Sequence, residues 1–459
     1  DDNYDDIKEV VKGKNIDQVV ITSLATSIPK DPTKCDEYEE ELKDYYHYED
    51  KIDKIVSEGN NIESFGDFVK RSNKNIKVPN NIGNLETDFL VTYTSGSTKN
   101  GFPKEIIHKN RSLITMGRFH DPELSGNPKL ENMRGLAHIH PESNTDVITC
   151  ISDNLMQGWS VALEPEYSKD KALDYVILNK PNYLNITTSF LIEMSKQYLM
   201  DGKYNKDGKS RKLPFLLATF AVGERTSKGE EKFINTFLRK SKAGSGVSIK
   251  GFKMPYTTLS IGGGDCEHGG IYYTLWKSLQ EKIHSPILGK KEMGMMPVPY
   301  VVVTALKQDS DGNYVECQYD EPGIIVANSY SNLSCYKNNP EATQKLIIAD
   351  NLGRNWVTTN TYGYIDKLGS VHVKGRIPEK KSLICETYMI DDIISEDTKN
   401  ILSSTTVENE NGLLITIQQQ PTSKKTIDEI YKSIYYRLQS KISNNMLEYI
   451  KIRVIPVRD

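Results

Sequence analysis

Short apolar runs alternate with longer segments of helical periodicity through the middle of the chain, from Asp88 to about Leu306. The apolar runs favour buried strands, and the segments between them favour amphipathic helices. The predicted strands are DFLVTYT (88–94), DVITCI (146–151), YLNITT (183–188) and FLLATFAV (215–222), and the predicted helices are RSLITMGRF (111–119), SFLIEMSKQYLM (189–200), EEKFINTFLRK (230–240) and IYYTLWKSLQEKI (271–283). This alternation predicts an α/β fold in which helices cover a mostly parallel sheet.

Two segments with different patterns follow. Residues 301–376 alternate in the manner of strands between turn signals such as DSDGN and DKLGS, which predicts a small β-rich subdomain. Residues 377–459 predict a separate small α+β domain, with a hairpin at Asn411-Gly412, an amphipathic helix beginning at Thr426 and a last strand, YIKIRVIPV. We therefore expect a large N-terminal domain over 1–376 and a small C-terminal domain over 377–459.

The first 85 residues mix a short predicted strand, QVVITSL (18–24), with charged and polar stretches. We expect a peripheral leading segment whose start is incomplete, because the chain opens DDNYDDIKEV without an initiator methionine.

Composition narrows the classes of function. The chain has 459 residues, 37% of them hydrophobic and 26% charged, which is typical of a folded protein of two or three domains. Its net charge is −4 without a basic block, so nucleic acid is not an expected partner. The longest apolar runs, such as YVVVTAL (300–306), are far shorter than the roughly 20 residues of a membrane span. Six dispersed cysteines without a C-x-x-C pair favour a reducing cytoplasm.

A loop rich in hydroxyls and glycine, YTSGSTKNGFPK (93–104), follows the first of the predicted strands. Backbone N–H groups, hydroxyls and a lysine in such a loop are suited to binding a polyphosphate. Gly96 and Gly101 have the spacing of a Walker loop, but Phe102-Pro103 stand where that motif requires Lys-Ser/Thr. An ordinary polar turn stays an open alternative.

The same run resembles the YTSGSTG-x-PKG signature of the adenylate-forming superfamily, which includes acyl-CoA synthetases, peptide-synthetase adenylation domains and luciferases. It differs by the insertion of Lys99 and Asn100 and by Glu105 in place of a glycine. In that superfamily the loop holds the β- and γ-phosphates of ATP. The resemblance therefore implies this role for Thr94, Ser95, Gly96, Ser97, Thr98 and Lys104.

Further segments resemble the nucleotide pocket of the superfamily. FLLATFAVGERTS is similar to the strand and turn beside the adenine, which implies contacts from Gly223 and Glu224. GGDCE (263–267) stands where the superfamily has Y-G-x-T-E, so Gly264, Asp265 and Cys266 are expected at the nucleotide and Glu267 at Mg²⁺. Gly263 replaces the aromatic residue that stacks on adenine, a place that Tyr272 could fill.

Downstream, TNT (359–361) stands at the T-G-D ribose motif, so Thr361 replaces its carboxylate, and Arg376 matches the arginine of that block. The stretch 320–343 resembles a strand and the loop before the Y…P..T helix, and we expect it to carry no chemistry. The C-terminal domain resembles a mobile lid with its hinge at Ile377–Glu379. The lysine that performs adenylation in the superfamily follows a last P-x-T-x-x-G-K segment, and the sequence stops at Asp459, just before it. We expect either that the end of the chain is incomplete and the lysine lies beyond it, or that this chain cannot form the adenylate efficiently.

The substrate side is less determined. By resemblance His140 lies near the substrate carboxylate, although a histidine of a surface loop fits the sequence equally well. Asp146 lies near the aspartate that binds the ammonium of amino acids, with the spacing different by about one residue. His138 with His140, or Cys266 with His268, are alternative metal pairs, and Cys266 near His268 is an alternative hydrolase or acyltransferase nucleophile.

Together these motifs predict a ligase that uses ATP and Mg²⁺ to convert a carboxylic acid into an acyl-adenylate and passes the acyl group to CoA or to a carrier-protein thiol. The competing hypothesis is a non-catalytic scaffold that keeps the fold and binds a partner, since Gly263 and Thr361 depart from the superfamily pattern.

Overall fold

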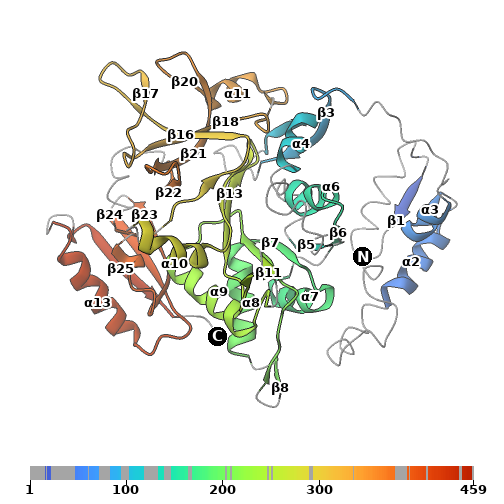
Figure 1. Cartoon of the computed structure of the whole chain (residues 1–459), viewed down its shortest axis with the longest axis horizontal. Helices are drawn as coiled ribbons and strands as arrows, with labels where there is room; N and C mark the ends of the chain where they lie inside the picture. Colours follow the sequence, from blue (N-terminus) through green and yellow to red (C-terminus); the bar gives the residue numbers. More distant parts are fainter. Residues whose placement is uncertain are drawn as a thin grey trace. The chain divides into compact units, whose positions relative to one another are not determined.

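The structure is a computed structural model of the chain (Figure 1), and it describes residues 16, 18–21, 47–59, 61–71, 83–94, 103–117, 133–138, 146–163, 168–201, 204–206, 209–245, 248–249, 252–288, 293–333, 335–377, 390–391, 393–409, 412–443 and 447–456. It divides into two compact units, one of residues 1–83 with 163–165, and one of residues 84–162 with 166–459. No helix in these ranges is long and apolar enough to cross a membrane.

The first unit holds a parallel pair of strands and two helices: β1 (Val19–Ile21), α2 (His47–Ser57), β2 (Ile62–Ser64) and α3 (Phe65–Arg71). The strand predicted in QVVITSL is confirmed over the three residues of β1.

A seven-stranded sheet with the order β15-β14-β13-β10-β7-β5-β6 is the centre of the second unit. Strands β5, β7, β10 and β13 run parallel, and β14 and β15 add antiparallel strands at one edge. The strand bounds are β5 Arg134–Ala137, β6 Ser160–Leu163, β7 Tyr183–Ile186, β10 Ala218–Ala221, β13 Ser260–Asp265, β14 Gly269–Thr274 and β15 Met296–Pro297. The predicted parallel sheet is confirmed, with strands in YLNITT and FLLATFAV.

Helices connect the strands of this sheet. They are η5 (a π-helix, Asp146–Ser152), α6 (Asp153–Met156), η6 (a 3₁₀-helix, Lys169–Lys171), α7 (Ala172–Asn179), α8 (Thr188–Leu199), α9 (Lys228–Lys240) and α10 (Lys277–Leu288). Two short hairpins join β8 (Asn205–Lys206) to β9 (Lys209–Ser210) and β11 (Ser248–Ile249) to β12 (Phe252–Lys253).

Two of the predicted elements are wrong. DVITCI is not a strand, because residues 146–152 form the π-helix η5. The helix expected over IYYTLWKSLQEKI begins only at Lys277, and its first four residues end strand β14 with their side chains buried. A short apolar run does not distinguish a buried strand from a buried helix, and sheet packing decided both cases.

Residues 301–376, which we expect to be a β-rich subdomain, contain an antiparallel sheet with the order β17-β16-β18-β21-β20, and β22 pairs with β21. Its strands are β16 (Val301–Gln308), β17 (Tyr314–Glu316), β18 (Gly323–Ser329), β20 (Ile347–Ala349), β21 (Asn355–Ile365) and β22 (Val371–Arg376), with helix α11 (Pro340–Leu346) before β20. A three-stranded sheet joins β3 (Asp88–Tyr93) and β4 (Glu105–Lys109) to β19 (Cys335–Tyr336), and helix α4 (Asn110–Gly117) follows β4.

Residues 390–456 form a small α+β module with its own apolar core (Figure 1, orange and red). It contains β23 (Ile401–Asn409), β24 (Gly412–Gln419), α13 (Ile427–Gln439) and β25 (Ile450–Ile455). Asn409 pairs with Gly412 as the predicted hairpin requires, and Thr426 caps α13 in a reciprocal bond with Glu429. The proposed boundary at 376/377 stays a prediction, because residues 378–389 lie outside the described ranges.

This C-terminal module contacts the start of helix α9. The Ser227 hydroxyl, which caps α9, also donates to the carbonyl of Leu402 at 2.6 Å, and Gln420 Nε2 donates to the carbonyl of Gly229 at 2.8 Å. A Cβ atom on Gly229 would lie 2.2 Å from the carbonyl oxygen of Ile401. The contact therefore requires glycine at this position.

We expect Gly229→Ala to separate the module from α9, because backbone atoms of β23 cannot move aside without breaking the strand. Overpacking of this kind costs about 1–3 kcal/mol. Urea unfolding and faster hydrogen exchange in β23 would measure the effect. Gly66→Ala is the matched control, because the nearest atom to its Cβ would be Ser64 Oγ at 3.8 Å. Unchanged exchange in the Gly229 variant would contradict this role.

A second prediction concerns His108 in β4, which is 1% exposed and shares a 2.9 Å hydrogen bond with the Thr92 hydroxyl. Burial lowers the pKa of His108 from 6.5 to about 4. Between pH 6.5 and about pH 4 the imidazole of His108 is protonated in the unfolded chain but not in the folded chain, so acidification lowers the free energy of unfolding. From pH 7 to pH 4 we expect His108→Gln to gain about 3 kcal/mol relative to wild type in denaturant unfolding. A difference that does not change with pH would contradict this assignment.

Candidate active site

The hairpin of β3 and β4 presents the predicted phosphate loop. The amide of Thr94 donates to the carbonyl of Lys104, and the amide of Lys104 donates to the Thr94 hydroxyl, both at 3.0 Å. These two bonds close the base of the loop and fix its ends. Residues 95–102 lie outside the described ranges, so the roles expected for Ser95, Gly96, Ser97 and Thr98 stay predictions.

Three side chains that are far apart in the sequence meet beside this hairpin. Lys104 Nζ lies 4.7 Å from the ring centroid of Tyr336, and the Tyr336 hydroxyl donates to Glu267 Oε1 at 2.5 Å. The Tyr336 side chain is 3% exposed, so its ring holds a fixed position between the lysine and the carboxylate. The lysine of the predicted phosphate loop and the predicted Mg²⁺ ligand are thereby linked through one aromatic ring.

Tyr336 was not among the residues predicted for the site. It lies in the stretch 320–343, which we expected to carry no chemistry, and the structure places it against Glu267. The reason is topological, since β19 crosses from the β-rich subdomain to pair with β4. The tyrosine directly before the predicted P..T helix was the available signal.

The turn from β13 to β14 orients Glu267 through Asp265. One carboxylate oxygen of Asp265 accepts from the amide of Glu267 at 3.1 Å, the amide of His268 at 2.8 Å and the ring Nδ1 of His268 at 2.6 Å. The other ring nitrogen of His268 faces the carbonyl of Val357 at 3.2 Å. Both ring nitrogens face acceptors, which suits a charged imidazolium. Burial alone would lower the pKa of His268, but the Asp265 carboxylate raises it.

Glu267 is a half-buried acid whose surroundings disfavour its charged form. Burial and the nearby Asp265 carboxylate raise the pKa of Glu267, and the hydrogen bond from Tyr336 offsets part of this effect. A divalent cation beside the carboxylate would relieve both penalties, because hard cations bind carboxylate oxygens and Mg²⁺ usually takes only one or two from the protein. The residues present therefore fit the Mg²⁺ expected at Glu267.

The alternatives built on Cys266 lose support. Burial and its two acidic neighbours raise the pKa of Cys266 to about 12, which disfavours the thiolate that a cysteine nucleophile requires. Within the described part of the chain no three His, Cys, Asp or Glu side chains are grouped to hold a metal ion.

The predicted nucleotide side is organised around Gly263, which stands opposite Tyr272 in the β13–β14 pair. A Cβ atom on Gly263 would lie 1.8 Å from Cε2 of Tyr272, so the tyrosine ring fills the space of the absent side chain. A side-chain hydrogen bond joins Tyr272 to Thr361, which pairs in turn with Arg376 across β21 and β22. The structure thus groups these predicted residues, although the Arg376 side chain lies outside the described part.

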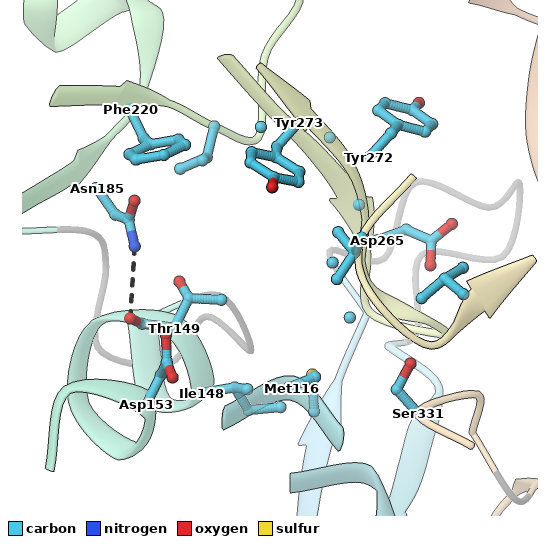
Figure 2. A pocket seen from close by; sticks show the side chains of 18 of the residues that line it. Met116, Ile148, Thr149, Asp153, Asn185, Phe220, Asp265, Tyr272, Tyr273 and Ser331 are labelled. Atoms are coloured by element: carbon cyan, nitrogen blue, oxygen red, sulfur yellow. Dashed lines mark hydrogen bonds between the residues drawn. The ribbon is translucent and has the colours of Figure 1, made fainter. Parts of the chain in front are cut away.

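A cavity of about 110 Å³ opens beside this glycine-rich strand (Figure 2). Tyr273 and Phe220 stand on one side of it, and Thr149 and Asp153 stand on the other. Asn185 donates to the carbonyl of Thr149 at 3.4 Å across its back wall. The lining also includes Met116, Ile148, Gly223, Gly264, Asp265 and Ser331. The walls are mostly apolar and aromatic with a few polar groups, as is usual for small-molecule sites.

Asp153, which is 4% exposed and lines this cavity, is not among the residues predicted from the sequence. The predicted residue is Asp146, which begins the π-helix η5 and whose side chain lies outside the described part. A π-helical turn accommodates one residue more than an α-helical turn. An offset of about one residue in this segment is what such a turn would produce.

Three other predicted positions have different surroundings. Glu224 accepts from both the amide (2.9 Å) and the hydroxyl (3.1 Å) of Ser189 and thereby caps α8. His138, at the end of β5, lies 5.5 Å from the Tyr175 ring and 5.1 Å from the Phe190 ring. Burial lowers the pKa of His138 to about 4, and the ring packs between two aromatic side chains as a core histidine does. His140 lies outside the described residues.

No protein-family model matches the sequence, and a comparison with curated proteins finds no match. Solved structures do match. The amide bond synthetase McbA from Marinactinospora thermotolerans aligns with a TM-score of 0.57 at 14% identity over 80% of this chain and 65% of that one. ATP-bound MatB from Rhodopseudomonas palustris gives 0.59 at 13% identity over 99% and 77%, and McyG A-PCP with phenylalanyl-adenylate gives 0.57 at 17% identity over 89% and 69%.

The chain therefore has the fold of the adenylate-forming enzymes, as its motifs predict, and it spans about two thirds of the length of McbA.

A double-mutant cycle tests whether the Tyr272 ring occupies the space that a side chain at position 263 would need. We expect Gly263→Ala alone to cost about 1–3 kcal/mol, because the new methyl group displaces the tyrosine ring. In a Tyr272→Ala background the same substitution should cost much less, which gives a coupling energy above about 0.5 kcal/mol. Urea unfolding of the four proteins measures it, and additive effects would show that the ring does not occupy this space.

Proposed function

We propose that this protein activates a carboxylic acid with ATP, forming an acyl-adenylate and pyrophosphate. The observation that carries the proposal is the contact series Lys104–Tyr336–Glu267, which brings together a lysine of the predicted phosphate loop and the predicted Mg²⁺ ligand. The fold supports it, because structures of the same fold are described with ATP or with an acyl-adenylate bound.

In the proposed reaction a carboxylate oxygen of the substrate forms a bond to the α-phosphorus of ATP, and the bond from that phosphorus to the pyrophosphate oxygen breaks. No proton transfer and no protein nucleophile is required. Lys104 and the loop 94–98 would hold the departing phosphates, which is stabilisation of developing charge by preorganised groups. Mg²⁺, when bound at Glu267, would neutralise further phosphate charge.

The cavity between Tyr273 and Asp153 would hold the substrate acid. Its lining includes Gly263, Gly264 and Tyr272, beside which we propose that the nucleotide binds. Because Tyr336 packs under Lys104, the ring would also keep the ammonium aimed toward the loop. In a second step, the sulfur of CoA or of a carrier-protein thiol would form a bond to the acyl carbon as AMP leaves.

ATP–pyrophosphate exchange across a panel of carboxylic acids tests the proposal. We expect exchange with at least one acid, its loss on chelation of Mg²⁺, and a decrease of about 100-fold or more in Lys104→Met and in Glu267→Gln. Lys337→Gln is the matched control, because it removes one positive charge near the same small sheet from a lysine whose ammonium is paired with Glu105 at 3.3 Å.

Two outcomes would contradict the enzyme. If ATP–pyrophosphate exchange fell as far in Lys337→Gln as in Lys104→Met and Glu267→Gln, the contact series would have no specific role in the reaction. Absence of exchange from the unmodified protein with every acid, together with retained ATP binding, would favour the scaffold that Gly263 and Thr361 first suggested.

A further inference from the structure

Helices α9 and α10 enclose a groove of about 460 Å³ that has no part in the site described above. Lys228, Lys232 and Arg239 of α9 line it at spacings of four and seven residues, which places them on one face of the helix. Lys277 and Lys282 line it from α10. Five basic and two acidic side chains therefore face the groove, although the whole chain carries a net charge of −4.

The two acids of the groove, Glu231 and Glu281, both lie near the same lysine. Glu231 accepts from Lys277 at 2.7 Å and from the Ser278 hydroxyl at 2.6 Å, and Glu281 lies 3.7 Å from the same lysine. Both acids are thus directed at Lys277. Among the residues that the structure describes, Lys232, Arg239 and Lys282 form no ion pair with a carboxylate, and Lys232 donates only to the Thr398 hydroxyl at 3.3 Å.

The remaining lining consists of hydroxyl and amide groups and one aromatic ring. It comprises Asn235, Thr236, Tyr256, Thr258 and Ser278. This lining favours neither an apolar ligand nor the apolar face of a partner helix. At a rise of 1.5 Å per residue, Lys232 and Arg239 are attached about 10 Å apart along α9, so they can offer positive charge at two places along the groove, as suits a ligand with more than one phosphate. The half-buried Tyr256 ring offers a surface on which a heterocycle can stack.

We propose that this groove binds a nucleotide with at least two phosphate groups, held by Lys232, Arg239 and Lys282, with its base against Tyr256. The volume lies within the range of about 300–1,000 Å³ that small-molecule sites occupy. The site does not depend on the proposed adenylation chemistry. The same ligand chemistry occurs in a free adenine nucleotide and in the nucleotide portion of CoA, and the experiment separates them.

Isothermal titration calorimetry with adenosine 3′,5′-bisphosphate, CoA, ADP and inorganic pyrophosphate tests the site on the full chain. We expect the groove to bind one equivalent of nucleotide in the Lys104→Met background, where the proposed ATP site is weakened, and this binding to fall at least tenfold when Lys232→Gln/Arg239→Gln is added and further with salt. The control Lys240→Gln/Lys253→Gln removes the same charge from exposed positions outside the groove and should leave the affinity unchanged. Binding should persist in Lys104→Met, which separates this groove from the proposed ATP site.

The outcomes are decisive in both directions. Tighter binding of adenosine 3′,5′-bisphosphate and CoA than of ADP would assign the groove to the CoA type of nucleotide, and the reverse order would assign it to a free adenine nucleotide. Equal affinity in the groove variant and the control, binding that disappears with Lys104→Met, or pyrophosphate binding as tightly as every nucleotide would overturn the proposal.

Discussion

One carboxylate oxygen of Asp265 organises the candidate site. It accepts two backbone amides and the ring of His268 in a single turn, and the second ring nitrogen of that histidine reaches the β-rich subdomain at Val357. The turn is therefore fixed from both sides, and Glu267 between these two residues has little freedom. Such constraint matters because a charged group stabilises a reaction only if it is already in place before the charge develops.

The two acids of this turn, Asp265 and Glu267, differ in their contacts. Asp265 accepts from His268 at 2.6 Å, and this contact raises the pKa of the histidine against the effect of burial. Glu267 keeps one carboxylate edge toward Tyr336, and its charge is disfavoured by burial and by Asp265. Two adjacent acids that differ in this way divide into a structural carboxylate and one suited to a cation, a division that sequence alone does not reveal.

Much of the architecture could be predicted from the sequence, because several signals were local. The capping pair at Thr426 and Glu429, the hairpin turn before Gly412 and the strands on either side of the hydroxyl-rich loop depend on neighbouring residues. The failures were non-local. The π-helix at 146–152 and the strand at 269–274 were decided by the sheet that they contact, and Tyr336 reached Glu267 only through a crossing strand. The nucleotide and substrate roles of individual residues stay predictions for the experiments above.

The ring of Tyr272 in the space of residue 263 has a consequence for how this sequence is compared with others. A comparison made position by position registers only a glycine at 263, whereas a comparison in three dimensions registers the aromatic ring of the cross-strand neighbour in that space. Solved structures of this fold align with the chain at only 13–17% identity, so side chains at this pocket are better matched by their place in space than by their order along the chain.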